Sequence, residues 1–185
     1  MAHLILVRHG APAIDESRPS ESWPLAEEGR KAVRVLSTQL RSFAMRAVAC
    51  GPEPKMIGTA ETLAESGTLP VRILPGLAEH KRASARFTDR AEFETTIESL
   101  FRKPGEIVFG EESADAVFTR FSQSVDQLLA AHAESVVAVS GGTAISLFVS
   151  RRSGVAAFPF WKSLKMPMAL VLDRSSWALR EILTP

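Results

Sequence analysis

Short runs of apolar residues alternate along the chain with longer amphipathic segments. The apolar runs predict buried strands, because they are short, rich in Val, Ile and Leu, and bounded by polar or turn residues. The predicted strands cover residues 3–7, 47–50, 71–74 and 136–139. Near the end of the chain, the segment "MALVLDRSSWALREIL" predicts two strands joined at Ser175 and Ser176, which we expect to form a hairpin at an edge of the sheet.

Between these runs, apolar residues recur at spacings of three and four, which is the period of an amphipathic helix. Asp89 with Glu92 three residues later is typical of a helix start. The predicted helices cover residues 26–43, 55–67, 89–101 and 113–132, and a further helix follows Gly141 and Gly142.

Strands that alternate with helices require crossover connections, which favour a mostly parallel sheet covered on both faces. The sequence therefore predicts an α/β fold, a three-layer sandwich in which helices flank a mostly parallel sheet. Its 185 residues are enough for one domain, which we expect to span residues 1–185. In such sheets, ligands bind at the carboxyl ends of the strands.

Composition excludes several classes of partner. The net charge is +1 and basic residues form no long block, so we expect no nucleic-acid partner. We see neither a signal peptide nor an apolar stretch approaching the ~18 residues of a membrane span, so we expect no membrane partner and a cytoplasmic protein. The single cysteine, Cys50, can form neither an internal disulfide nor a cysteine-rich zinc site.

Two strand ends carry candidate chemistry. After the first strand come Arg8, His9 and Gly10. The Arg8 guanidinium suits a phosphate or carboxylate, the neutral imidazole of His9 can act as a nucleophile or base, and Gly10 would let a backbone N–H approach a ligand closely. After the fourth strand, Ser140 and Gly141 open a helix, whose free N–H groups can bind an anion.

Other nucleophile and nucleotide patterns are incomplete. Ser140 lacks the Gly-x-Ser-x-Gly elbow of serine hydrolases, and the Ser-Gly-Gly-Thr segment lacks the Gly-Lys-Ser/Thr ending of a P-loop. Cys50 has Met56 where a cysteine phosphatase needs an arginine, so it is interpreted as a buried strand residue.

Six elements in this order resemble the histidine phosphatase superfamily, the phosphoglycerate-mutase-like family with an Arg-His-Gly signature. The resemblance covers nearly the whole chain. The elements are "LVRHGAP", "PLAEEGRKAV", "GPEPKMIGTAETLA", "GLAEHK", "GEES" and "VVAVSGGTAIS".

The resemblance implies a phosphomonoester hydrolase that needs no metal or other cofactor. His9 would attack the phosphorus and form a phosphohistidine. Arg8 would hold the phosphate oxygens, and Glu79 would protonate the leaving oxygen and later activate water. The partner would be a small phosphorylated substrate or a phosphoprotein.

Two positions depart from the family pattern. Ser140 stands where the family has its second catalytic histidine, and Lys55 replaces its second arginine. Losing one preorganised donor of this kind costs roughly 10²–10³ in rate. The chain is therefore either a weakened or specialised phosphatase or an inactive relative that binds a phosphorylated ligand. Ser140, Gly141 and Lys55 are expected to contact the phosphate in both cases.

Further residues could complete the anion pocket. His80 could swing in to replace the missing imidazole, and Arg82 or Arg86 could add charge. The aromatic cluster at residues 158–161 and the methionines at 166–168 are interpreted as packing, or alternatively as a pocket rim or a dimer contact. Neither the physiological substrate nor the oligomeric state is predicted.

Overall fold

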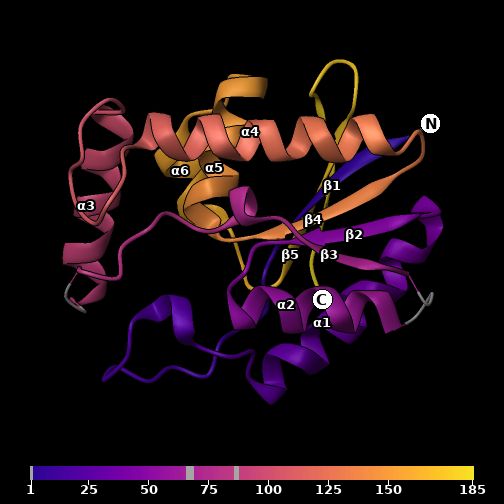
Figure 1. Ribbon diagram of the computed structural model, residues 1–185, viewed down its shortest axis with the longest axis horizontal. Coiled ribbons are helices and arrows are strands. Elements are labelled where there is room, and N and C mark those ends of the chain that lie inside the picture. The colour runs from indigo at the N-terminus through magenta and orange to yellow at the C-terminus, as the bar shows by residue number, and fades with distance from the viewer. Residues whose placement is uncertain (1, 66–68, 86–87) are drawn as a thin grey trace.

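A six-stranded sheet lies between two layers of helices (Figure 1). The computed structural model describes residues 2–65, 69–85 and 88–185. The strands are β1 (His3–Arg8), β2 (Ala47–Cys50), β3 (Val71–Ile73), β4 (Val136–Ser140), β5 (Met168–Asp173) and β6 (Leu179–Leu183). The helices are α1 (Glu27–Leu40), α2 (Pro54–Glu65), α3 (Arg90–Arg102), α4 (Ala114–Ala131), α5 (Gly142–Ser153) and α6 (Ala157–Ser163).

The strand order is β3-β2-β4-β1-β5-β6. The pairs among β1 to β4 are parallel, whereas β5 is antiparallel to both β1 and β6. This confirms the predicted three-layer sandwich with a mostly parallel sheet, and β5 and β6 form the predicted hairpin at its edge.

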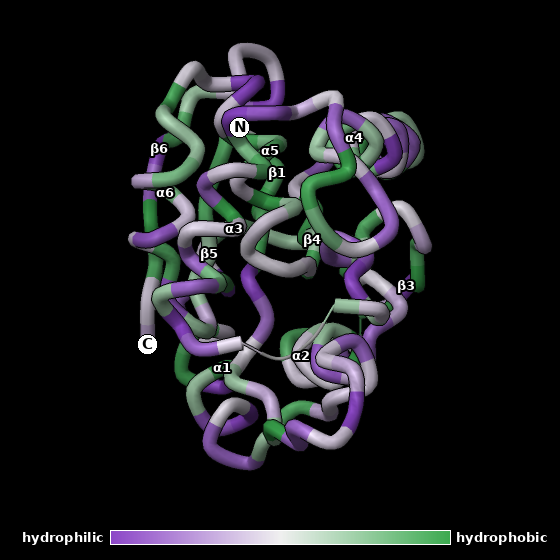
Figure 2. Tube along the Cα trace, turned by 90° about the vertical axis from the view of Figure 1, so that its left-hand side faces the viewer, coloured by the Kyte–Doolittle hydropathy of each residue, from purple (hydrophilic) through white to green (hydrophobic). Residues whose placement is uncertain are grey.

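Each strand sends alternate side chains into two separate cores, because successive side chains point to opposite faces of a sheet. On β1, Leu4 and Leu6 pack with α4 and α5, whereas Ile5 and Val7 pack with α1 and α2. Figure 1 shows these helix pairs on opposite faces of the sheet, and in Figure 2 the strands β4 and β5 are largely green.

One helix differs from the sequence-based expectation. The segment with Phe158 and Trp161 forms the separate helix α6, whereas the sequence analysis assigned it to packing, or alternatively to a pocket rim or a dimer contact, and predicted no helix there. It was missed because it is one short element that contains a proline and begins shortly after the αL residue Gly154 that ends α5. The predicted stop of the second helix near Gly67 lies outside the described residues.

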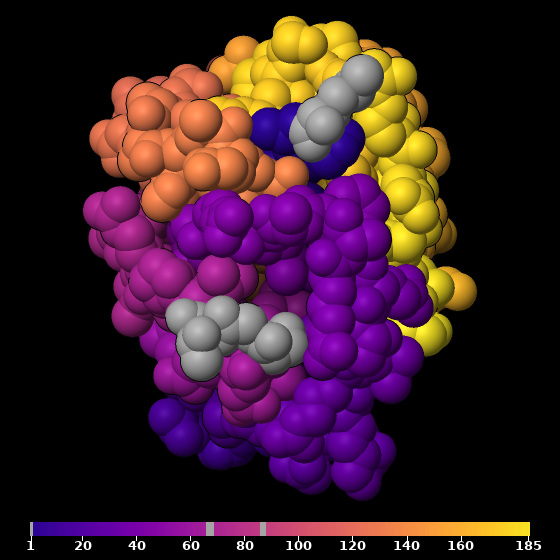
Figure 3. Space-filling model, turned by 90° about the vertical axis from the view of Figure 1, so that its right-hand side faces the viewer, coloured from indigo at the N-terminus to yellow at the C-terminus, as the bar shows by residue number. Residues whose placement is uncertain are grey.

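The sheet brings the two candidate strand ends together. β1 and β4 are parallel neighbours in which Arg8 pairs with Ser140, and both run from right to left in Figure 1. Figure 3 shows the opposite end, where the start of β1 lies between the end of α4 and the C-terminal hairpin. His3 begins β1 and His132 follows α4, so both are remote from the candidate site. Among the described helices, none has the length and apolar character to cross a membrane.

Candidate active site

His9 follows β1 directly and lies in a small cavity of about 180 Å³. Its Nδ1 lies 2.8 Å from the Gly10 carbonyl oxygen. A carbonyl only accepts, so Nδ1 carries the proton and the lone pair resides on Nε2. Burial lowers the pKa of His9 to about 3, against the raising effect of the Gly10 carbonyl. The imidazole is therefore a neutral nucleophile at physiological pH.

Gly10 has a packing role. Its own N–H donates to the Thr59 hydroxyl at 3.0 Å and is therefore engaged within the protein. A Cβ at this position would lie 2.7 Å from Leu25 Cδ1 and 3.0 Å from the Gly29 carbonyl oxygen. Gly10 thus lets the loop after β1 pass close to α1, and this contact fixes the position of His9.

The cations expected to hold phosphate line the same cavity as His9 but are partly engaged. Arg8 Nη1 donates to the Leu164 carbonyl, while its buried Nε has no partner among the described residues. Lys55 Nζ donates to the Ser20 carbonyl at 2.6 Å and to Glu53 Oε2 at 2.5 Å. Burial raises the pKa of Glu53, against the lowering effect of Lys55. The Lys55 ammonium therefore already has an ion pair and a hydrogen bond within the protein, which reduces what it can contribute to a bound phosphate.

Glu79 binds the beginning of α5. Its carboxylate accepts hydrogen bonds from the N–H groups of Thr143, Ala144 and His80, each at 2.8 to 2.9 Å. Burial raises the pKa of Glu79, but Arg82 and these N–H groups outweigh burial and bring the pKa to about 2. The helix start binds an anion as expected, but this anion is a carboxylate of the protein itself.

Ser140 and Gly141 lie beneath this contact. The Ser140 side chain is fully buried, and its hydroxyl donates to the Leu77 carbonyl at 2.7 Å. At Gly141, a Cβ would lie 2.3 Å from Glu79 Oε2. In this structure the serine therefore ties β4 to the loop that carries Glu79, and the glycine lets the carboxylate approach.

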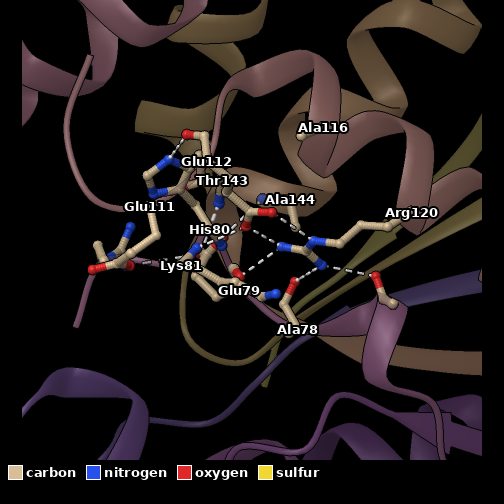
Figure 4. Close-up of polar contacts among 12 residues, drawn as sticks. Ala78, Glu79, His80, Lys81, Glu111, Glu112, Ala116, Arg120, Thr143 and Ala144 are labelled. Atoms are coloured by element: carbon tan, nitrogen blue, oxygen red, sulfur yellow. Dashed lines mark hydrogen bonds and ion pairs between the residues drawn. The ribbon is translucent and has the colours of Figure 1, made fainter. Parts of the chain in front are cut away.

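A partly buried arginine holds that loop in place (Figure 4). Arg120 of α4 donates to the carbonyl groups of Gly76, Ala78 and Glu79, and it forms an ion pair with Glu112. Glu112 also accepts the Lys81 N–H at 2.8 Å. The sequence analysis missed Arg120, because a charged residue within an amphipathic helix is indistinguishable from a solvated one without the fold.

His80 points away from His9. Its Nε2 lies 2.8 Å from the Glu112 carbonyl oxygen, and its ring stacks on Phe109 with centroids 4.6 Å apart. It contributes to the lining of a neighbouring cavity and is absent from the lining that the described residues form around His9. Within this structure, His80 does not take the place of an imidazole at Ser140, which the sequence analysis had left open.

Arg82 does reach the site. It lines the cavity of His9, its Nη2 lies 4.0 Å from Glu79 Oε2, and its guanidinium covers the Phe93 ring. Its Nη1 is buried without a hydrogen-bond partner among the described residues. Arg82 therefore retains donor capacity for a phosphate, whereas Arg86 lies outside the described residues.

Apolar side chains complete the cavity. They come from four separate segments, so no local motif could identify them as one group. They are Pro12, Ile14, Trp23, Phe93, Trp161 and Met166. Of the two interpretations of the aromatic and methionine clusters, Trp161 and Met166 fit a pocket rim.

In the described part of the chain, no three or more His, Cys, Asp or Glu side chains group in a way that could hold a metal ion. Burial raises the pKa of the Cys50 thiol to about 12, which fits a buried strand residue and not a thiolate nucleophile.

Comparison with known proteins places this geometry in a family. Residues 4–172 match the sequence profile of the Histidine phosphatase superfamily (branch 1). No curated protein was found to match the chain.

Several solved structures share the fold. A mycobacterial glucosyl-3-phosphoglycerate phosphatase in complex with VO3 has a TM-score of 0.77 at 18% identity, covering 100% of this chain and 98% of that one. A phosphoserine phosphatase mutant from Entamoeba histolytica in complex with phosphoserine has a TM-score of 0.77 at 15% identity, covering 98% and 96%. A putative alpha-ribazole-5'-P phosphatase from Escherichia coli reaches 0.72 at 21% identity, covering 100% and 96%. At these identities the likeness concerns the fold.

Proposed function

The chain belongs to the histidine phosphatase superfamily, and on that premise we propose that it is a phosphomonoester hydrolase acting through a phosphohistidine at His9. The observation that carries the proposal is the state of His9. Its proton resides on Nδ1, so the lone pair of Nε2 is available in a cavity that also contains Arg8. Membership of the superfamily and structural likeness to phosphatases support a phosphatase-like function.

In the first step, His9 Nε2 attacks the phosphorus of the ester, so that a P–N bond forms while the bond to the ester oxygen breaks. That oxygen leaves with the electron pair and takes its proton from water, because Glu79 is ionised. Arg8 and Arg82 stabilise the negative charge on the transferring phosphoryl group. In the second step, water attacks the phosphohistidine, the P–N bond breaks, and both protons of the water leave with the released phosphate. Inorganic phosphate then leaves.

A specific observation favours a second candidate, a relative that binds a phosphorylated ligand without turning it over. The Ser140 hydroxyl is used by the Leu77 carbonyl, and the Lys55 ammonium is paired with Glu53. Fewer free cationic donors therefore face the transferring phosphoryl group than in a site with a second histidine and a second arginine.

Phosphate release from an aryl phosphate, measured from pH 4 to 8 with a chelator present, separates the two candidates. The proposal predicts release by the native protein and at least a 10³-fold loss in His9→Ala, by analogy with removed nucleophiles. Silence of the native protein, with activity appearing in Ser140→His, would instead support the binding protein.

A further inference from the structure

Two cavities meet at Glu79. The smaller one, of about 180 Å³, contains Arg8 and His9, and the larger one, of about 520 Å³, extends along the loop after Glu79. Ser20, Glu79 and Arg82 line both. When the phosphoryl group of an ester lies at His9, its leaving group can therefore lie in either of the two cavities. The lining of each cavity indicates which leaving group it would bind.

The entrance to the smaller cavity is apolar. Ile14 and Met166 are 62% and 42% exposed, and both line this cavity. Phe93 of α3 and Trp161 of α6 lie beside them, with ring centroids 5.9 Å apart. Exposed apolar side chains that converge from separate segments on one cavity indicate an apolar ligand, because their exposure has no packing benefit.

The larger cavity has a polar lining in which the carboxylates of Glu53, Glu79 and Glu111 already have partners within the protein. The carboxylate of Glu111 accepts the N–H groups of Ala83 and Ser84, and Glu53 is paired with Lys55. The larger cavity therefore offers a leaving group fewer free partners than its charged residues suggest.

The hydrogen bonds of Glu79 add an independent constraint. Oε1 accepts two backbone N–H groups, and Oε2 accepts one and lies 4.0 Å from Arg82 Nη2, so a proton on the carboxylate would weaken these contacts. An alkoxide leaving group needs a proton from a general acid, because its conjugate alcohol is a very weak acid. A phenolate does not, because a phenol has a pKa of about 10.

We propose that the site prefers aryl phosphomonoesters, with the aromatic ring of the leaving group packed against the apolar side chains at the entrance, Trp161 among them. The inference rests on the proposed function. His9 Nε2 forms the bond to phosphorus, the bond between phosphorus and the phenolic oxygen breaks, and the electron pair leaves with the phenolate. The phenolate then takes its proton from water. A free phenolic ester and a phosphotyrosine side chain present the same chemistry to this entrance.

The preference is tested by comparing kcat/KM for phenyl phosphate and glycerol phosphate in the native protein. We expect phenyl phosphate to be favoured by at least 100-fold, and substituted phenyl phosphates to react faster as the pKa of the phenol falls. Glycerol phosphate reacting within threefold of phenyl phosphate would overturn the inference while leaving the proposed function intact. A phosphotyrosine peptide in the same assay distinguishes the two sources of the aryl group.

The apolar entrance is tested with two equally exposed isoleucines. Ile14 lines the cavity of His9 and is 62% exposed, whereas Ile107 is 63% exposed and lies outside the linings that the described residues form for either cavity. Ile14→Ser should lower kcat/KM for phenyl phosphate severalfold, and Trp161→Leu roughly tenfold, with little change for glycerol phosphate. Ile107→Ser should change neither. Equal losses for both esters, or no loss in Trp161→Leu, would contradict the inference.

If the protein hydrolyses no ester, the proposed function is wrong. A binding measurement then still tests the preference for an aryl group separately. Phenylphosphonate should then bind at least tenfold more tightly than methylphosphonate in calorimetry, and this advantage should shrink in Trp161→Leu. Equal binding of the two phosphonates would overturn the aryl preference as well.

Discussion

The two strand ends that form the site are neighbours in the sheet, yet they use their polar residues differently. At the end of β1, the side chains of His9 and Arg8 line a cavity. The Nε2 of His9 has a free lone pair, and the Arg8 guanidinium is only partly hydrogen-bonded. At the end of β4, the Ser140 hydroxyl is bound to Leu77, and two N–H groups of α5 are bound to Glu79. The β1 end therefore carries the chemistry we propose, whereas the β4 end mainly positions Glu79.

The comparison shows that neighbouring strand ends of one site can have different roles, because the polar groups at the β4 end are engaged within the protein. Arg82 adds positive charge beside Glu79, and it comes from a loop held by Arg120 and Glu112. Each of the following substitutions tests one of the contacts at the β4 end.

The largest expected effect concerns the charge of Glu79. Its pKa in the folded protein, about 2, lies below its ordinary value of 4.5. A lowered pKa stabilises the fold fully above pH 4.5, and this stabilisation is lost as the pH falls through about 2. In urea unfolding, Glu79→Gln should therefore lose about 3 kcal/mol of this stabilisation at pH 7 but only about 1.5 kcal/mol at pH 3.

Glu16→Gln, in an exposed loop, is the matched control and should show no such dependence. A difference between the native protein and Glu79→Gln that stays constant from pH 7 to pH 3 would mean that the carboxylate is not held ionised by the start of α5.

A smaller effect is expected at Gly141. In Gly141→Ala, the new Cβ would lie 2.3 Å from Glu79 Oε2, so the carboxylate must move away from α5. We expect the free energy of unfolding to fall by about 2 kcal/mol. Gly105→Ala is the control, because a Cβ there lies no closer than 3.6 Å to another group. If both variants were equally stable, Glu79 would not depend on close contact with this glycine.

The smallest effect separates a structural from a catalytic Ser140. Ser140→Ala removes one buried hydrogen bond to Leu77 and should cost about 1 kcal/mol of stability. Phosphate release should change by less than about threefold. A loss of 10² or more in kcat without a change in stability would assign the Ser140 hydroxyl to the phosphoryl group, as the sequence-based interpretation did.

Much of the fold could be predicted from the sequence, because strand and helix patterns depend on local periodicity. The run from Leu4 to Val7 is apolar throughout, and its residues are buried on both faces of the sheet as parallel strands usually are. The start of α3 at Asp89 was also readable, since the Asp89 side chain accepts the N–H of Glu92. Such signals need no knowledge of distant segments.

The site was predictable only in part, because its remaining contacts join residues far apart in the chain. From the order of the motifs, the sequence analysis predicted one site formed by Arg8, His9, Lys55 and Glu79. These four residues do line one cavity. The sequence did not reveal that Glu79 would occupy the N–H groups of α5, because that contact spans 64 and 65 residues.

The central claim is that His9 carries the phosphoryl group. The most direct test is to mix the protein with phenyl phosphate, quench the reaction at alkaline pH, where a phosphohistidine survives, and map the modified peptide by mass spectrometry. Phosphate on the peptide containing His9, absent from His9→Ala, is the predicted result. Equal phosphate release by the native protein and His9→Ala, with no phosphate on that peptide, would contradict the account.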